Sequence, residues 1–147
     1  MVLGAGGQLG SELVGLLPDT VGLFHDQVSV SDRAAIEAAL LRYRPDVVFN
    51  CAAYNAVDRA ETEPEVAHAV NAAGAENVAL ACRRLGARLV HFSTNFVFDG
   101  HLDRPYIEKD EAHPLGVYGS SKLDGERAVL AALPESCLLY TSDAADE

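Results

Sequence analysis

Short apolar stretches alternate along the chain with stretches whose apolar residues recur every three or four positions. The short stretches predict strands, and they cover residues 1–3, 21–24, 46–53 and 89–93. The third of them is apolar without alternation, which is typical of a strand covered on both faces of a parallel sheet. The stretches between them predict helices at residues 11–17, 31–44, 64–86 and 116–133. This alternation predicts an α/β fold, a doubly wound parallel sheet.

Local signals place the ends of these helices. Ser31 is the expected N-cap of the second helix, and Asp32 suits the positive end of its dipole, so we interpret Asp32 as capping and not as a ligand. Pro64 fits the first turn of the third helix, and Gly86 fits its end. Residues 94–115 contain glycine, proline and mixed charge, and they predict a long loop of the kind that often carries function.

A glycine-rich turn follows the first predicted strand and precedes the first predicted helix. Its sequence is Gly4-Ala5-Gly6-Gly7-Gln8-Leu9-Gly10. Glycine at positions 4, 7 and 10 allows a tight turn, close approach of the backbone to a diphosphate, and close packing of helix on strand. The N-terminus of the helix then offers free N–H groups and a positive dipole end to the phosphates. The turn therefore predicts an NAD(P)-binding, Rossmann-like domain.

Composition and charge limit the classes of function. A chain of 147 residues with 49% hydrophobic residues is long enough for one domain with its own core. The net charge of −11 argues against a nucleic-acid partner or an anionic membrane surface. Without a leader or an apolar run long enough to cross a bilayer, we expect a cytoplasmic protein. Its three cysteines lack the spacing of a metal site, and we expect them to be reduced and mostly buried.

The last eleven residues differ in character from the rest. Residues 137–147 resemble a translated sequencing-library adapter, although their apolar beginning could form an accidental strand. We therefore expect residues 1–136 to be an incomplete NAD(P)-binding domain and residues 137–147 to be a non-native tail.

The last predicted helix carries a tyrosine and a lysine one turn apart. Tyr118 and Lys122 are four residues apart, so the two side chains share one face of the helix. A nearby ammonium favours the ionised form of a phenol, which could then exchange a proton with a carbonyl oxygen near neutral pH. A hydroxyl of Ser93 or Thr94, after the fourth strand, would hold the same oxygen. The hydride must come from a bound nicotinamide.

Four longer segments carry a resemblance to a known family. They are GAGGQLG, RPDVVFNCAAYNAVDRAE, HFSTNFVFDG and PYIEKDEAHPLGVYGSSKLDGE. Together they resemble the extended short-chain dehydrogenases/reductases, and within them the enzymes that reduce the 4-keto group of a dTDP-linked deoxysugar. The likeness covers essentially residues 1–135. It implies a nucleotide-sugar substrate, a nicotinamide cofactor and, in the full-length parent, a homodimer.

The resemblance also implies a role for individual residues. Tyr118 would donate the proton, and Thr94 would bind the substrate oxygen. Lys122 would activate Tyr118 and hold the ribose of the cofactor. Asn95 would face the sugar. The remaining cofactor-binding positions would be Gly4, Gly7, Gln8, Leu9, Gly10, Asp26, Val30, Ala52, Ala53 and Tyr54.

The sequence departs from the family pattern in three places. Asn95 and Phe96 stand where relatives carry aspartate and tyrosine, which affects substrate identity more than reaction type. His25 aligns with the acidic residue expected at the adenosine ribose, and Asp26 follows one residue later. A histidine tolerates a 2′-phosphate better than a carboxylate does, so both NADPH and NADH stay open. Ser29 removes a further carboxylate at the adenine end.

Several polar residues have simpler interpretations. Glu12 matches a glutamate that contributes to a Mg²⁺-mediated dimer contact in some relatives, but a solvated helix residue is the favoured reading. His68, Asn71 and His91 are expected to satisfy local hydrogen bonds. Residues 97–100 are expected to be loop packing followed by a turn.

Two other functions stay open at this point. One is a nucleotide-sugar epimerase or dehydratase, although residues 44–61 and 97–100 look more like the reductase. The other is a non-catalytic dinucleotide-binding regulatory subunit on the same scaffold. We expect the 147-residue chain itself to be inactive and only marginally stable, because the substrate-binding lobe would lie beyond it.

Overall fold

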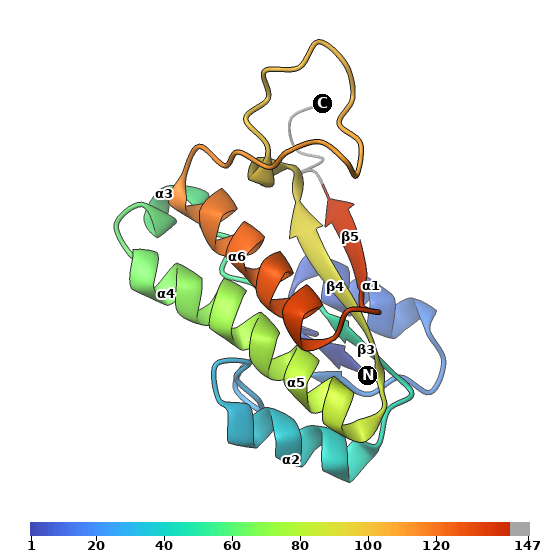
Figure 1. Cartoon of the computed structure of the whole chain (residues 1–147). Coiled ribbons are helices and arrows are strands. Elements are labelled where there is room, and N and C mark those ends of the chain that lie inside the picture. The colour runs from blue at the N-terminus through green and yellow to red at the C-terminus, as the bar shows by residue number, and fades with distance from the viewer. Residues whose placement is uncertain (142–147) are drawn as a thin grey trace.

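The chain forms a parallel β-sheet with helices on both faces. In the computed structural model, residues 1–141 are described, and they contain a sheet of five strands in the order β2-β1-β3-β4-β5 (Figure 1). Every neighbouring pair of strands is parallel. The strands are β1 (Val2–Leu3), β2 (Gly22–Leu23), β3 (Val47–Asn50), β4 (Arg88–Thr94) and β5 (Cys137–Thr141). The prediction of a doubly wound α/β fold is confirmed.

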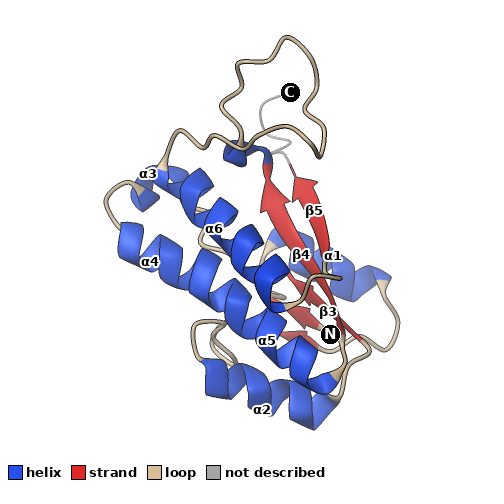
Figure 2. Cartoon of the chain, viewed as in Figure 1, coloured by secondary structure: helices blue, strands red, loops and turns tan. Residues whose placement is uncertain are grey.

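The helices divide unevenly between the two faces of the sheet. Helix α1 covers one face, and α2, α5 and α6 lie side by side on the other (Figure 2). The helical segments are α1 (Gln8–Leu16), α2 (Arg33–Tyr43), α3 (Val57–Ala60), α4 (Pro64–His68), the π-helical segment η1 (Ala69–Gly74), α5 (Ala75–Leu85), the 3-10 turn η2 (Asn95–Val97) and α6 (Val117–Ala132). The strand order reverses between β1 and β3, and ligands bind at such a switch point in open α/β sheets.

The predicted helix ends are correct to within one to three residues. The N-cap of α2 is Asp32 and not Ser31, because the Asp32 carboxylate accepts the Ala35 N–H at 3.1 Å. The Ser31 hydroxyl instead donates to the Ala69 carbonyl at 3.2 Å. Gly86 ends α5 in the left-handed region with a φ of 72°, as expected for a glycine after a helix.

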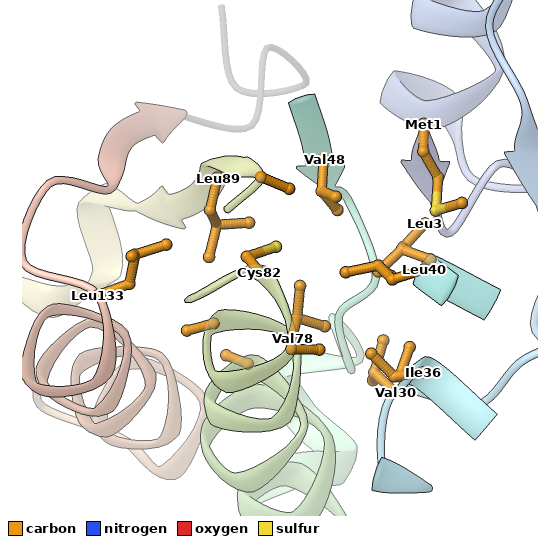
Figure 3. Packing of buried hydrophobic residues seen from close by; sticks show 14 of the residues in the cluster. Met1, Leu3, Val30, Ile36, Leu40, Val48, Val78, Cys82, Leu89 and Leu133 are labelled. Atoms are coloured by element: carbon orange, nitrogen blue, oxygen red, sulfur yellow. The ribbon is translucent and has the colours of Figure 1, made fainter. Parts of the chain in front are cut away.

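The main apolar core lies between the sheet and the layer formed by helices α2, α5 and α6. Figure 3 shows its side chains converging from β3 and β4, from α2, and from α5. The largest of them are fully buried, which removes their apolar surface from water and stabilises this three-helix layer against the strands. Representative members are Leu3, Ile36, Leu40, Val48, Val78 and Leu89.

The apolar beginning of the predicted tail forms a strand, β5. Residues 137–141 pair with β4, and the Thr141 hydroxyl donates to the Ser93 carbonyl at 3.1 Å. Cys82 is buried as expected, whereas Cys137 is exposed, and none of the three cysteines is in a disulfide. Residues 142–147 of the predicted tail lie outside the described residues. No helix within residues 1–141 is long and apolar enough to span a bilayer.

Candidate active site

A cleft of about 490 Å³ opens at the switch point between β1 and β3. Its walls are the turn after β1, the segment after β2, the turn after β3, and side chains from the α4–η1 helix. The lining residues are Gly4, Gly6, Gly7, His25, Ser29, Val30, Cys51, Ala52, Ala53, Tyr54, Asn55, Val66 and Val70. The cleft therefore lies at the edge where this fold binds its ligands.

Two glycines of the first turn are required by its geometry. Gly4 has a φ of 76°, and a Cβ on it would lie 2.7 Å from the backbone nitrogen of Ala52. A Cβ on Gly10 would lie 2.2 Å from the Gly4 carbonyl oxygen, which is too close for any side chain. Helix α1 begins after Gly7 and has no side-chain cap. The N–H groups of its first turn, at the end of the helix near the cleft, therefore have no side-chain partner among the described residues. Such an N-terminus suits a diphosphate.

The cleft contains some of the predicted cofactor residues and not others. Gly4, Gly7, Val30, Ala52, Ala53 and Tyr54 line it. Gln8 and Leu9 lie in the exposed first turn of α1, and Gly10 is buried under the turn, so these three do not line it. Asp26 does not line it either.

After β2, the cleft is lined by His25 and not by the predicted Asp26. The chain folds back immediately after β2, where the Val28 N–H donates to the Phe24 carbonyl at 3.0 Å. This tight turn leaves His25 and Ser29 on the cleft, with Asp26 exposed between them. The cleft lining therefore includes His25 and not Asp26, and the role of Asp26 in binding the cofactor stays a prediction.

Tyr54 is held from both sides at the wall of the cleft. The buried Asn71 amide accepts the Tyr54 N–H at 2.8 Å and donates to the Tyr54 carbonyl at 2.9 Å. The Tyr54 hydroxyl donates to the Glu63 carboxylate, and this hydrogen bond raises the pKa of the phenol. Asn71 also donates to the Ser121 hydroxyl of α6 at 2.9 Å. The expected hydrogen bonds of Asn71 are thus present, and they join the cleft wall to α6.

Lys122 is a buried cation beside the fourth strand. Its side chain lies on α6 one turn after Tyr118, and its Nζ donates to the Phe92 carbonyl at 2.6 Å. Burial lowers the pKa of Lys122 to about 8, although the nearby Glu126 and Cys51 oppose this shift. A buried ammonium at this position is a fixed positive charge near the end of β4, which fits the predicted role of Lys122 and excludes a solvated surface lysine.

Tyr118 is positioned by aromatic and backbone contacts at the start of α6. Its ring meets the Phe96 ring edge to face, with centroids 5.6 Å apart and planes at 76°. The Ser121 hydroxyl donates to the Tyr118 carbonyl at 2.8 Å. A Cβ on Gly119 would lie 2.2 Å from the Phe96 carbonyl, so the first turn of α6 packs directly on the residues after β4.

Of the two hydroxyls predicted at the end of β4, only Thr94 is near the site edge. Its Oγ1 accepts the Phe96 N–H at 3.3 Å and lies 3.4 Å from the amide oxygen of Asn95. Ser93 alternates to the other face and donates to the Glu126 carboxylate under α6. The Ser93 hydroxyl is thus engaged by Glu126, and the roles suggested for Ser93 and Thr94 both stay predictions.

A layer of buried polar groups lies between β4 and α6. Glu126 accepts from Ser93 and, at 2.8 Å, from the Tyr140 hydroxyl of β5. His91 Nδ1 lies 3.1 Å from the Asn50 amide, while its Nε2 has no hydrogen-bond partner within residues 1–141. Burial, helped by the charge of Lys122, lowers the pKa of His91 to about 3. The expected local hydrogen bond of His91 is thus present at Nδ1, and Nε2 is left without one among the described residues.

The fold and the site together define a class of protein. A parallel sheet with a glycine turn at its switch point, and a tyrosine and a buried lysine on the helix after β4, is the arrangement of an NAD(P)-binding, short-chain dehydrogenase/reductase domain. The chain belongs to the family described as RmlD substrate binding domain, whose model matches residues 1–143.

Several relatives of this chain are named as dTDP-4-dehydrorhamnose reductases. A dTDP-4-dehydrorhamnose reductase of Mycobacterium tuberculosis is 49% identical over 97% of this chain and 49% of its own length. A second, from Streptomyces griseus, is 46% identical over 92% of this chain and 46% of its length. The crystal structure of dTDP-4-dehydrorhamnose reductase from Bacillus anthracis in complex with NADP matches with a TM-score of 0.93 at 34% identity, over 96% of this chain and 52% of that chain. The chain spans about half the length of these relatives.

The described residues give no support to the suggested metal contact. No group of three or more histidine, cysteine, aspartate or glutamate side chains within residues 1–141 is placed to hold a metal ion. Glu12, the residue that suggested Mg²⁺, lies exposed on α1.

Proposed function

We propose that the complete protein uses NADPH or NADH to reduce the 4-keto group of a dTDP-linked deoxysugar, as a dTDP-4-dehydrorhamnose reductase of dTDP-L-rhamnose biosynthesis. The observation that carries the proposal is the placement of Tyr118 and the buried Lys122 on α6, joined through Ser121 and Asn71 to the wall of the glycine-turn cleft. A proton donor and a dinucleotide site then share one edge of the sheet. The relatives named above support the choice of substrate.

The cleft suits a nicotinamide dinucleotide. The uncapped N-terminus of α1 and the glycine turn can receive the diphosphate, and Ala52, Ala53 and Tyr54 would line the rest of the cofactor. His25 at the adenosine end can meet a 2′-phosphate without repulsion, so NADPH is compatible with the site. A bound nicotinamide supplies the hydride.

The remaining chemistry falls to the residues of this chain. Tyr118 would donate its proton to the carbonyl oxygen as that oxygen becomes an alcohol, and the Lys122 ammonium would stabilise the phenolate that is left. The Thr94 hydroxyl would hold the same oxygen in line. Asn95 would contact the sugar with an amide where relatives place a carboxylate. The identity of the sugar is therefore a separate question from the type of reaction.

The decisive experiment measures oxidation of NADPH and NADH by the complete protein with a dTDP-4-keto-deoxysugar. We expect Tyr118→Phe to lower kcat by about a hundredfold or more, because positioned acid catalysis is worth about 10²–10⁴ in rate. Tyr43→Phe, at the exposed end of α2, is the matched control and should turn over normally. Full activity in Tyr118→Phe would refute the mechanism. Cofactor binding without any turnover in the unaltered protein would favour the regulatory subunit.

Further attributes of the protein are proposed from the family resemblance and the sequence. We infer a homodimer and a cytoplasmic location for the complete protein, and the resemblance implies Mg²⁺ at the dimer contact. Residues 137–147 are proposed to be a non-native tail after an incomplete domain of residues 1–136. The 147-residue chain alone is expected to show no turnover, and an assay of this chain beside the complete protein tests that expectation.

A further inference from the structure

Helix α6 begins without a side-chain cap of its own. Its N-cap residue is Gly116, which has no side chain to accept the N–H groups of the first turn. The N–H of Val117 is instead accepted by the Glu61 carboxylate at 2.7 Å. Glu61 lies 56 positions earlier in the chain, at the end of α3. A carboxylate from a separate element therefore caps the helix that carries Tyr118, and it also complements the positive end of the helix dipole.

Gly116 provides the space that this cap needs. A Cβ on Gly116 would lie 2.7 Å from Glu61 Oε1. The backbone of Gly116 is extended, with φ −134° and ψ 173°, a conformation open to every residue type. Backbone strain therefore does not account for glycine here, and a Cβ at this position would require the Glu61 carboxylate to shift.

The segment that carries Glu61 also borders the cofactor cleft. Two residues further on, Glu63 accepts from the Tyr54 hydroxyl and pairs with Arg59 at 2.7 Å. Tyr54 lines the cleft. Residues 54–63 are thus fixed at one end to the cleft wall and at the other to the first turn of α6.

We infer that Glu61 is a positioning residue for Tyr118, and this inference rests on the proposed function. Tyr118 is the second residue of α6, so it lies in the first turn of the helix. Glu61 caps this turn through its hydrogen bond with the Val117 N–H. Helix ends fray when their N–H groups lack partners. Misplacement of a reacting group by about 1 Å can cost about a hundredfold in rate. Loss of the cap should therefore lower the rate of the chemical step more than it weakens cofactor binding.

The first experiment compares two substitutions of Glu61 in the complete protein. Glu61→Ala removes the acceptor, and we expect kcat to fall about tenfold while the KM for NADPH changes less than about twofold. Glu61→Gln keeps an acceptor oxygen and should recover most of kcat. Glu65→Ala is the control, because Glu65 is an exposed glutamate of α4 whose side chain has no hydrogen bond or ion pair with other described residues.

The second experiment tests the contact between Gly116 and Glu61. Gly116→Ala should displace the carboxylate and reproduce the loss of kcat, and the double variant with Glu61→Ala should be no worse than either single variant. Normal kcat in Glu61→Ala would overturn the inference. So would equal losses in Glu61→Gln and Glu61→Ala, or additive losses in the double variant.

Failure of this inference can be told apart from failure of the proposed function. If the unaltered complete protein has no turnover, the proposed function fails, and with it any role of Glu61 in that reaction. Amide exchange at Val117 gives an independent measure of the cap. Faster exchange in Glu61→Ala than in Glu61→Gln supports the cap, and equal exchange contradicts it.

Discussion

The two halves of the site are built in different ways. Around β1 and α1 the cleft is made of backbone: a turn that needs Gly4 and Gly10, and a helix start without a side-chain cap. Around β4 and α6 the site is made of buried polar side chains, among them Lys122, Glu126 and His91. The first half depends on glycines at positions with no room for a side chain. The second half depends on particular polar atoms in a buried environment, where an unpaired charge is costly.

This difference predicts two kinds of sensitivity. In the backbone half, added volume should be harmful and changes of surface charge should matter little. In the polar half, changes of a single functional group should affect chemistry or pH dependence even where the volume is conserved. Each substitution below tests one side of this contrast.

The largest effect is expected at Lys122. Lys122→Met keeps most of the volume and removes the ammonium that donates to the Phe92 carbonyl. We expect kcat of the complete protein to fall by about 10²–10³, within the range of acid–base contributions to rate. The chain has one other lysine, the exposed Lys109, and Lys109→Met is the control. Steady-state kinetics of both variants measure the effect, and equal kinetics would remove Lys122 from the mechanism.

A glycine pair on α1 tests the backbone half. Gly10→Ala places a methyl group 2.2 Å from the Gly4 carbonyl, and we expect a loss of about 2–3 kcal/mol in the free energy of unfolding. Gly15→Ala lies on the same helix with no atom within 4 Å of its Cβ, and it should stabilise by about 0.5–1 kcal/mol through helix propensity. Urea unfolding measures both. Similar values for the two variants would show that the close approach of helix and turn is absent.

The sequence predicted what is local and missed what depends on distant partners. The order of strands and helices, the glycine turn and the spacing of Tyr118 and Lys122 follow from short-range pattern, and the structure has them. The π-helical segment Ala69–Gly74 was not predicted, because nothing in its local pattern distinguishes it from an α-helix. The hydrogen bond from Ser93 to Glu126 was not predicted, since the two residues lie 33 positions apart in the chain.

Neighbouring residues with similar propensities also limit prediction. Ser31 and Asp32 are both good N-caps, and only the structure shows that Asp32 is the one used. His25 and Asp26 differ by one step in a tight turn, and the turn geometry decides which lines the cleft. The Glu61 cap of α6 could not be predicted, since the chain brings the two segments together only in the folded state.

His91 tests whether the polar half controls the response to acid. Burial lowers its pKa to about 3, so the folded state leaves this ring neutral where the unfolded chain, with a pKa near its usual value, binds a proton. Stability from His91 is therefore present at neutral pH and is lost as the pH falls from about 6.5 toward 3, at up to about 1.4 kcal/mol per pH unit. His91→Gln should reduce this slope, and His113→Gln, in an exposed position, should not. Urea unfolding between pH 7 and 4.5 measures the slopes, and equal slopes would contradict the buried neutral ring.

The smallest effect is expected at His25, the one place where the backbone half should respond to charge. Among the described residues that line the cleft, His25 is the only one whose side chain can carry a positive charge. His25→Asp adds no volume but places a carboxylate at the adenosine end, where it would repel a 2′-phosphate and accept a bond from a 2′-hydroxyl. We expect the Kd for NADPH to rise about fivefold relative to that for NADH, or about 1 kcal/mol.

His101→Asp, in the exposed loop after β4, is the control. Because the proposed diphosphate site consists of backbone groups that this substitution leaves alone, NADH should bind at least as tightly as before. A loss of both cofactors would mean that the turn after β2 has moved, and an unchanged ratio would place the 2′ position away from His25.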